Sequence, residues 1–282
     1  MQRLLYFELM FDSSSHIKIF ALVLCFCTSI FATEFVRPIT RPHSGISLGS
    51  MAELRDDVYS LDGRFSAEVA FNNRISVYSD ISYRFFSYQW ETELHDQLHE
   101  LVDLRVNGFN ESYLGVKFFP IEFVGLAVNW RFEPGDGSQN DRFQRLGVEP
   151  LTVIPISEYL EFGAALGFYS FIERDNFQPG DEIGGQVSLI WKPFYKLQNP
   201  RGLKLSYVFL LRKRIEESKN LNMKTAYQKM DDEYAGFRMR AAIEYDLKSI
   251  PLGYGFAYEM NRGTLFGFET GHRIEFFFTS NW

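Results

Sequence analysis

The chain has very little cysteine and no long apolar stretch beyond its first 32 residues. Of its 282 residues only Cys25 and Cys27 are cysteines, and both lie within the apolar run at 17–32. If the chain is cleaved after Ala32, the mature protein carries no thiol, which excludes disulfides, cysteine metal ligands and thiol catalysis. The net charge is −7 and no basic stripe is present, so a nucleic-acid partner is excluded as well.

The N-terminal apolar run is predicted to be a targeting segment. Lys18 lies at its start and the small residue Ala32 ends it, and sixteen residues are too few for a membrane-spanning helix. Residues 1–32 are therefore predicted to be a secretory signal peptide. Residues 33–43, which include Pro38 and Pro42, are expected to form a periplasmic lead segment, and residues 44–282 are expected to form one domain.

Aromatic residues are abundant, with 29 Phe and 15 Tyr, and they alternate with polar or small residues. One example is the stretch 235–245, where Phe237, Met239 and Ile243 share one parity and Arg238 and Arg240 share the other. A period of two is the period of a β-strand with two different faces. The mature sequence contains twelve such stretches.

Short connections alternate with longer polar ones between these stretches. Tight turns are expected near Asn72, Pro120, Pro155, Pro200 and Pro251, with a further turn at Asp62-Gly63. The polar faces carry many charges, which would be very costly in the dry core of a soluble protein. The pattern therefore predicts an all-β fold: a single antiparallel transmembrane barrel of about twelve strands, with both termini periplasmic.

The last seventeen residues, 266–282, alternate strictly and end on an aromatic side chain. Phe276, Phe278 and Trp282 make this stretch resemble the C-terminal strand of bacterial outer-membrane β-barrel proteins. The resemblance implies a location in the bacterial outer membrane, with outer-membrane lipids and the barrel-insertion machinery as partners. It also implies that these three aromatic residues form the insertion signal.

The polar parity is expected to line the barrel lumen. The predicted lumen charges are Arg84, Asp103, Arg105, Lys117, Arg131, Glu161, Arg238, Arg240, Glu244, Glu269, Arg273 and Glu275. They have two interpretations: an internal ion-pair network that partly plugs the barrel, or a ring that selects small solutes by charge. Neither interpretation requires a cofactor.

Two groups of histidines raise alternatives to a pore. His95 and His99 have helical spacing, but a third metal ligand is lacking, so no metal site is predicted. His272 has the parity that faces lipid, which suggests a lipid-active enzyme if Ser50 on the first strand lies beside it. A third possibility is a surface interaction or adhesion protein that acts through the charged loop at 212–232. The main prediction is a non-enzymatic barrel, either a narrow passive pore for small solutes or a plugged structural barrel.

Overall fold

The computed structural model describes residues 37–55, 58–89, 108–132, 144–173, 177–178, 180–194, 202–216, 219–220, 235–247, 250–263 and 267–282. The predicted signal peptide lies outside these ranges. Twelve long strands form the body of the protein: β1 (Gly45–Arg55), β2 (Val58–Ala70), β3 (Ile75–Gln89), β4 (Gly108–Ile121), β5 (Val124–Phe132), β6 (Arg145–Ser157), β7 (Leu160–Phe171), β9 (Glu182–Trp191), β10 (Gly202–Arg214), β12 (Ala235–Asp246), β13 (Gly253–Gly263) and β14 (Gly267–Asn281).

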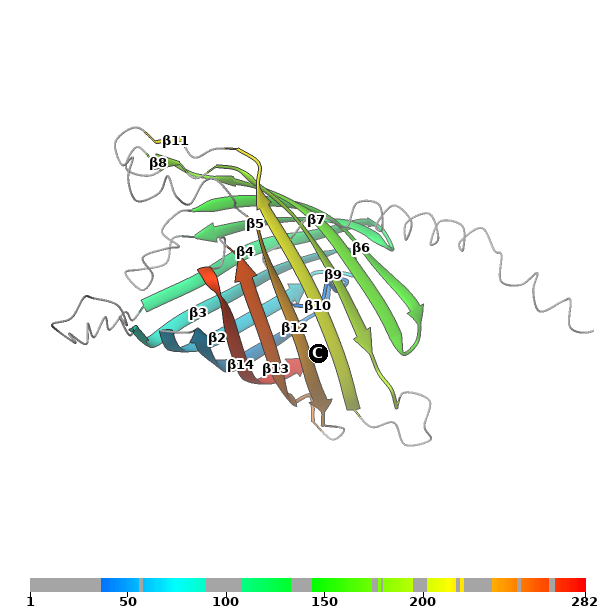
Figure 1. Cartoon of the computed structure of the whole chain (residues 1–282). Helices are drawn as coiled ribbons and strands as arrows, with labels where there is room; N and C mark the ends of the chain where they lie inside the picture. The colour runs from blue at the N-terminus through cyan, green and yellow to red at the C-terminus, as the bar shows by residue number, and fades with distance from the viewer. Residues whose placement is uncertain are drawn as a thin grey trace, which may run out of the picture.

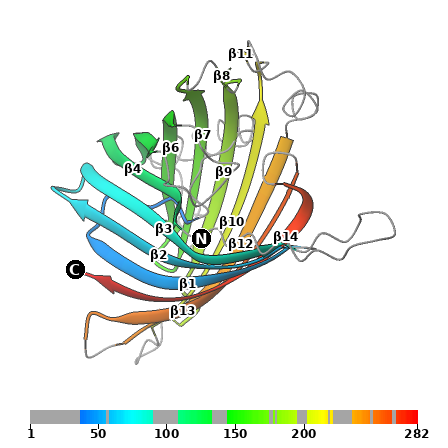
Figure 2. The ribbon, with the colours of Figure 1, turned by 90° about the vertical axis from the view of Figure 1, so that its left-hand side faces the viewer.

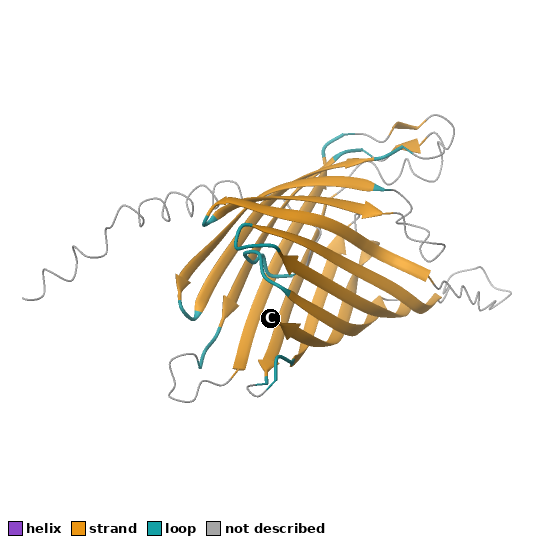
Figure 3. Cartoon of the chain, turned by 180° about the vertical axis from the view of Figure 1, so that it is seen from behind, coloured by secondary structure: helices purple, strands orange, loops and turns teal. Residues whose placement is uncertain are grey.

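These strands form one closed antiparallel barrel in which each strand pairs with its neighbours in the chain (Figure 1). The prediction of a twelve-stranded barrel is confirmed. Two short strands, β8 (Phe177–Gln178) and β11 (Lys219–Asn220), form a separate small sheet beyond one rim. Figure 3 draws strands and loops throughout the described part of the chain, and no helix there is long and apolar enough to cross a membrane.

The barrel closes where the first strand meets the last. β1 and β14 pair over their whole length, from Gly45 opposite Asn281 to Arg55 opposite Gly271. At the rim the Trp282 amide donates to the Ser44 carbonyl at 3.1 Å. Both ends of the barrel therefore lie at one rim, which also carries the tight turns at 71–74, 122–123 and 158–159. That this rim faces the periplasm remains a prediction.

The outer surface is apolar around the barrel. Leu48, Phe71 and Phe256 are 61%, 70% and 57% exposed, and most other outward positions hold Leu, Ile, Val, Phe or Tyr. Such a continuous apolar surface is too large for a soluble monomer and needs lipid against it. Closure leaves no sheet edge unpaired, which a strand in hydrocarbon requires. The strands run obliquely around the barrel, as Figure 2 shows.

Two predicted turns are wrong. Asp62 and Gly63 lie within β2, at a register irregularity next to Leu61, because the Asp62 carboxylate accepts two hydrogen bonds from Arg84 across the sheet. Pro155 lies within β6, which continues to Ser157, and the turn follows at Glu158 and Tyr159. In both places a residue type common in turns is held in a strand by its neighbours.

Candidate functional site

The structure turns the predicted polar faces inward. Nine of the twelve predicted lumen charges can be placed, and each is buried or half-buried: Arg84, Lys117, Arg131, Glu161, Arg238, Arg240, Glu244, Arg273 and Glu275. Asp103, Arg105 and the Glu269 side chain lie outside what the structure describes. Further lumen charges were missed, among them Arg37, Arg64 and Asp80, and these three prove central to the lumen.

An ion-pair network joins the strands on either side of the closing seam. Arg273 on β14 lies 3.2 Å from the Glu53 carboxylate on β1 and 3.1 Å from Glu259 on β13. Arg84 on β3 lies 2.9 Å from Asp62 on β2 and 3.8 Å from Glu53. Five β-strands are thus connected through buried charges. Removing one member of such a pair would leave the other charge without a partner in a poorly solvated site.

A second cluster gathers on the opposite wall, near the rim that carries β8 and β11. Arg145, Arg212 and Arg214 all contact the Glu182 carboxylate, with an Arg212 Nε to Oε2 distance of 3.1 Å. The Arg145 guanidinium also lies 4.1 Å from the centre of the Tyr169 ring, a cation–π distance. These contacts connect β6, β9 and β10 through one carboxylate.

The chain before β1 lies inside the barrel. Residues 37–43, here called the lumen segment, were expected to form part of a periplasmic lead. Instead, the Ile39 amide donates to Ser188 Oγ at 3.0 Å, and Gln186 Nε2 donates to the Arg37 carbonyl at 2.6 Å. Both partners lie on β9, so the segment is bound to the inner wall. The domain boundary itself stays a prediction.

Ile39 anchors the lumen segment by its side chain. It is 9% exposed and packs in a cluster with Tyr78, Phe119, Ala127, Leu151, Val153 and Ala165. Gly163 provides the space: a Cβ at that position would lie 2.8 Å from Ile39 Cβ and 2.9 Å from the Ile39 carbonyl oxygen. This contact depends on a glycine in β7 and on an apolar patch of the inner wall.

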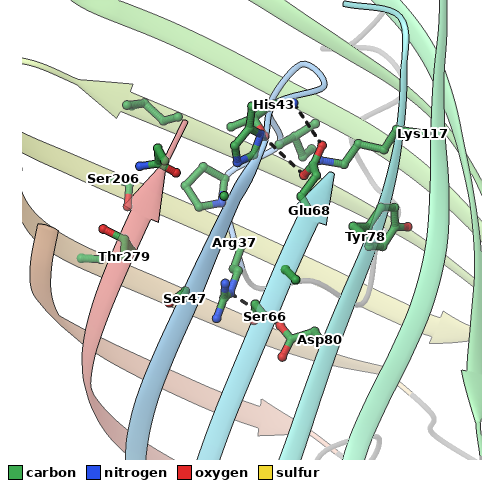
Figure 4. Close-up of a pocket in the computed structure, with 18 of the residues that line it drawn as sticks. Arg37, His43, Ser47, Ser66, Glu68, Tyr78, Asp80, Lys117, Ser206 and Thr279 are labelled. Atoms are coloured by element: carbon green, nitrogen blue, oxygen red, sulfur yellow. Dashed lines mark hydrogen bonds and ion pairs between the residues drawn. The ribbon is translucent and has the colours of Figure 1, made fainter. Parts of the chain in front are cut away.

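The two ends of the lumen segment contact charged side chains of the barrel wall. At one end the Arg37 guanidinium lies 3.6 Å from Asp80 on β3 (Figure 4). It also lies 3.8 Å from Glu275 on β14. At the other end His43 Nδ1 lies 3.6 Å from the Glu68 carboxylate, which Lys117 also contacts at 2.7 Å. The segment therefore crosses the lumen from one charged group to another.

Beside the lumen segment lies a cavity of about 220 Å³. Its lining includes Arg37, Ile39 and His43 of the segment and side chains from β1, β2, β3, β10, β12 and β14. The space left in the barrel at this level is thus bordered by the segment on one side and by strands on the other.

The outward histidine has a local partner. His272 is exposed, and its Nδ1 lies 2.6 Å from the Tyr258 hydroxyl with the two rings stacked. Ser50 pairs with Phe276, four residues from His272 along β14. That offset is about 13 Å at the rise of a β-strand, too far for a Ser–His pair. The suggested lipid-active site is not formed.

Neither of the two metal-ligand candidates noted in the sequence can be placed. His95 and His99 lie outside the described residues. Within the ranges that the structure describes, no group of three or more His, Cys, Asp or Glu side chains could hold a metal ion.

Comparison with known proteins supports the architecture. No protein-family model and no curated protein matches the chain. An outer membrane channel from Pseudomonas putida F1 matches with a TM-score of 0.62 and 8% identity, over 89% of this chain and 99% of that chain. The NanC porin matches with a TM-score of 0.52 and 9% identity, over 84% of this chain and 99% of its own. This chain has the fold of outer-membrane channels. At such low identities the likeness establishes the fold alone.

Proposed function

We propose that this protein is a narrow passive pore for small solutes in the bacterial outer membrane, with no enzymatic activity. The observation that carries the proposal is the cavity of about 220 Å³ within a closed barrel whose lumen is polar and charged. A purely structural barrel has no need of such a space. An apolar outer surface and a polar lumen are the arrangement of a barrel that conducts water-soluble molecules.

In this proposal the lumen segment narrows the pore. Its position across the lumen leaves less room than the twelve strands alone would enclose. Diameter grows with strand number, so a twelve-stranded barrel has a modest bore even before a segment enters it. The solutes are therefore small, of the size of single sugars, amino acids or inorganic ions.

The same proposal includes the partners implied by the location. Outer-membrane lipids would cover the apolar surface, and the barrel-insertion machinery would bind the last strand through Phe276, Phe278 and Trp282. Phe278 and Trp282 are 53% and 68% exposed, as residues open to contact would be.

The test is single-channel recording of the purified, refolded protein in planar lipid bilayers. We expect discrete current steps that grow linearly with voltage in potassium chloride. Folding into the bilayer is checked independently by heat-modifiable migration on gels. A folded, heat-modifiable protein that never produces current steps would contradict the pore and leave a plugged structural barrel.

A further inference from the structure

The charges around the cavity balance. Four cationic side chains and four carboxyl groups line it, so their charges cancel when all four carboxyl groups are counted as ionised and His43 as neutral. These are Arg37, Lys117, Lys204 and Arg240, and Glu68, Asp80, Glu149 and Glu244. A cavity with no net charge does not attract ions of either sign from a distance.

The lysines of the cavity are already engaged. Lys117 Nζ lies 2.7 Å from Glu68 Oε2, and Lys204 Nζ lies 2.7 Å from Glu244 Oε2. An ion that enters must compete with a partner already at hydrogen-bond distance. It must also give up water in a confined space, which is costly for a charged group.

The arginines of the cavity are engaged in the same way. Arg240 Nη2 donates to Glu275 Oε2 at 2.8 Å. The lining carboxylate Asp80 accepts from the guanidinium of Arg64, a residue outside the cavity lining, at 3.1 and 3.0 Å. Arg37 lies between these two carboxylates. Each lining cation thus has an opposite charge beside it, and Glu149, the lining carboxyl group outside these pairs, accepts hydrogen bonds from Asn129 at 2.7 Å and Tyr169 at 3.0 Å.

A row of hydroxyl groups lies next to these pairs. Thr279 on β14 pairs with Ser47 on β1, Ser47 pairs with Ser66 on β2, and Ser66 pairs with Asp80 on β3. All four residues line the cavity, and the Arg37 side chain points toward this row (Figure 4). Ser66 Oγ is buried and makes no hydrogen bond within the described part of the chain. Hydroxyls both donate and accept, so the row offers partners to other hydroxyl groups.

Apolar surface completes the cavity. Tyr78, Phe277 and Ile39 line it from β3, β14 and the lumen segment. Small-molecule sites commonly combine apolar walls with a few polar groups that fix orientation. The C–H faces of a sugar or sugar alcohol suit such walls, and its hydroxyls suit the polar row.

We propose that this cavity selects small, neutral, polyhydroxylated solutes such as sugar alcohols and single sugars. This inference rests on the pore function proposed above and names its substrate class. A hydroxyl can accept a hydrogen bond from a cation and donate one to a carboxylate without breaking their ion pair. A charged solute of the same size must either break an ion pair of the lining or leave its own charge without a partner. The free-energy cost of either outcome discriminates against charged solutes.

The experiment measures block of the potassium chloride current by sorbitol, gluconate and glucosamine, three six-carbon solutes that are neutral, anionic and cationic. We expect saturable block by sorbitol and at least about fivefold weaker block by the two charged solutes, the factor that one lost hydrogen bond gives. Block by gluconate or glucosamine as strong as block by sorbitol would overturn the inference. So would open channels that none of the three solutes blocks.

Variants locate the site. Ser47→Val together with Ser66→Val removes two hydroxyls from the row, and we expect sorbitol block to weaken about twenty-five-fold, roughly fivefold for each hydroxyl. Ser50→Val is the matched control, because Ser50 lies on the same strand and is exposed on the outer surface. Heat-modifiable migration shows that both proteins are folded. Unchanged sorbitol block in the folded double variant would overturn the site. Complete absence of current in the unaltered, folded protein would instead remove the pore, and the inference with it.

Discussion

Ile39→Ala is expected to release the lumen segment and raise the conductance. The Ile39 side chain is 9% exposed and belongs to a buried apolar cluster with six residues of the barrel wall, and Gly163 lies beside it. Truncating a buried isoleucine to alanine costs about 2–5 kcal/mol. At about 1.4 kcal/mol per factor of ten, the lower value reduces the ratio of bound to released segment about thirty-fold. A released segment leaves a wider bore, so larger or noisier currents are expected.

Gly163→Ala tests the same contact from the barrel side. The added Cβ would lie 2.6 Å from Ser188 Oγ and 2.8 Å from Ile39 Cβ, closer than real Cβ atoms approach. We expect the conductance to rise as in Ile39→Ala, because the clash with the new methyl group displaces the lumen segment more easily than it displaces strand β7. Ile243→Ala is the control: this isoleucine faces outward and is 56% exposed. Conductance in Ile39→Ala and Gly163→Ala equal to that of Ile243→Ala would refute the reasoning.

Three further predictions concern stability, insertion and pH. Arg240→Gln removes a buried ion-pair partner and is expected to destabilise the barrel by about 3–5 kcal/mol, seen as unfolding at a lower temperature on heat-modifiable gels. Arg41→Gln removes a partner from an exposed ion pair and is expected to change the stability by about 1 kcal/mol or less. Leu48→Arg places a charge on the apolar outer face and is expected to cost about 2–4 kcal/mol in folding into lipid vesicles; an unchanged folding yield in a urea titration would contradict this. Desolvation in the lumen lowers the pKa of His43 below its ordinary 6.5 despite the nearby Glu68 carboxylate, so the released segment takes up a proton more readily than the bound one. The effect is small, because 46% of the His43 side chain is still exposed. Binding of the lumen segment to the barrel wall is therefore strongest above pH 6.5 and weakens as the pH falls below this value. The conductance should rise on acidification in the unaltered protein and should not change with pH in His43→Gln.

Much of the barrel could be predicted because the information is local. Along β12, residues such as Phe237 and Arg238 alternate between the two faces, and a strand in a barrel wall has only a lipid side and a lumen side. The alternation also placed Arg240 and Glu275 inside, where the structure pairs them at 2.8 Å. Pairing of neighbours in the chain follows from short turns, so strand order needed no long-range information.

The features that could not be predicted from the sequence depend on contacts between residues far apart in the chain. Asp62 and Gly63 are common turn residues, and only Arg84, 22 residues away, shows why they lie in a strand. A turn at Asp62 and Gly63 would interrupt the alternation of inward and outward residues, and Arg64 is for this reason absent from the predicted lumen charges. The lumen segment carries Pro38 and Pro42 and has the composition of a linker. Its binding site on β9 is 149 residues distant, and no local pattern predicts that contact.

The central claim, that small solutes pass through the cavity beside the lumen segment, is tested most directly by placing a cysteine in the path. Ser206 lines the cavity, and the adjacent Tyr207 faces outward and is 44% exposed. Ser206→Cys and Tyr207→Cys are made in a chain that lacks residues 1–32 and therefore has no other cysteine. A small cationic thiol reagent added during single-channel recording is expected to reduce the current through Ser206→Cys stepwise and irreversibly, and to leave Tyr207→Cys unchanged. Current through the folded Ser206→Cys protein that the reagent never alters would contradict passage through this cavity.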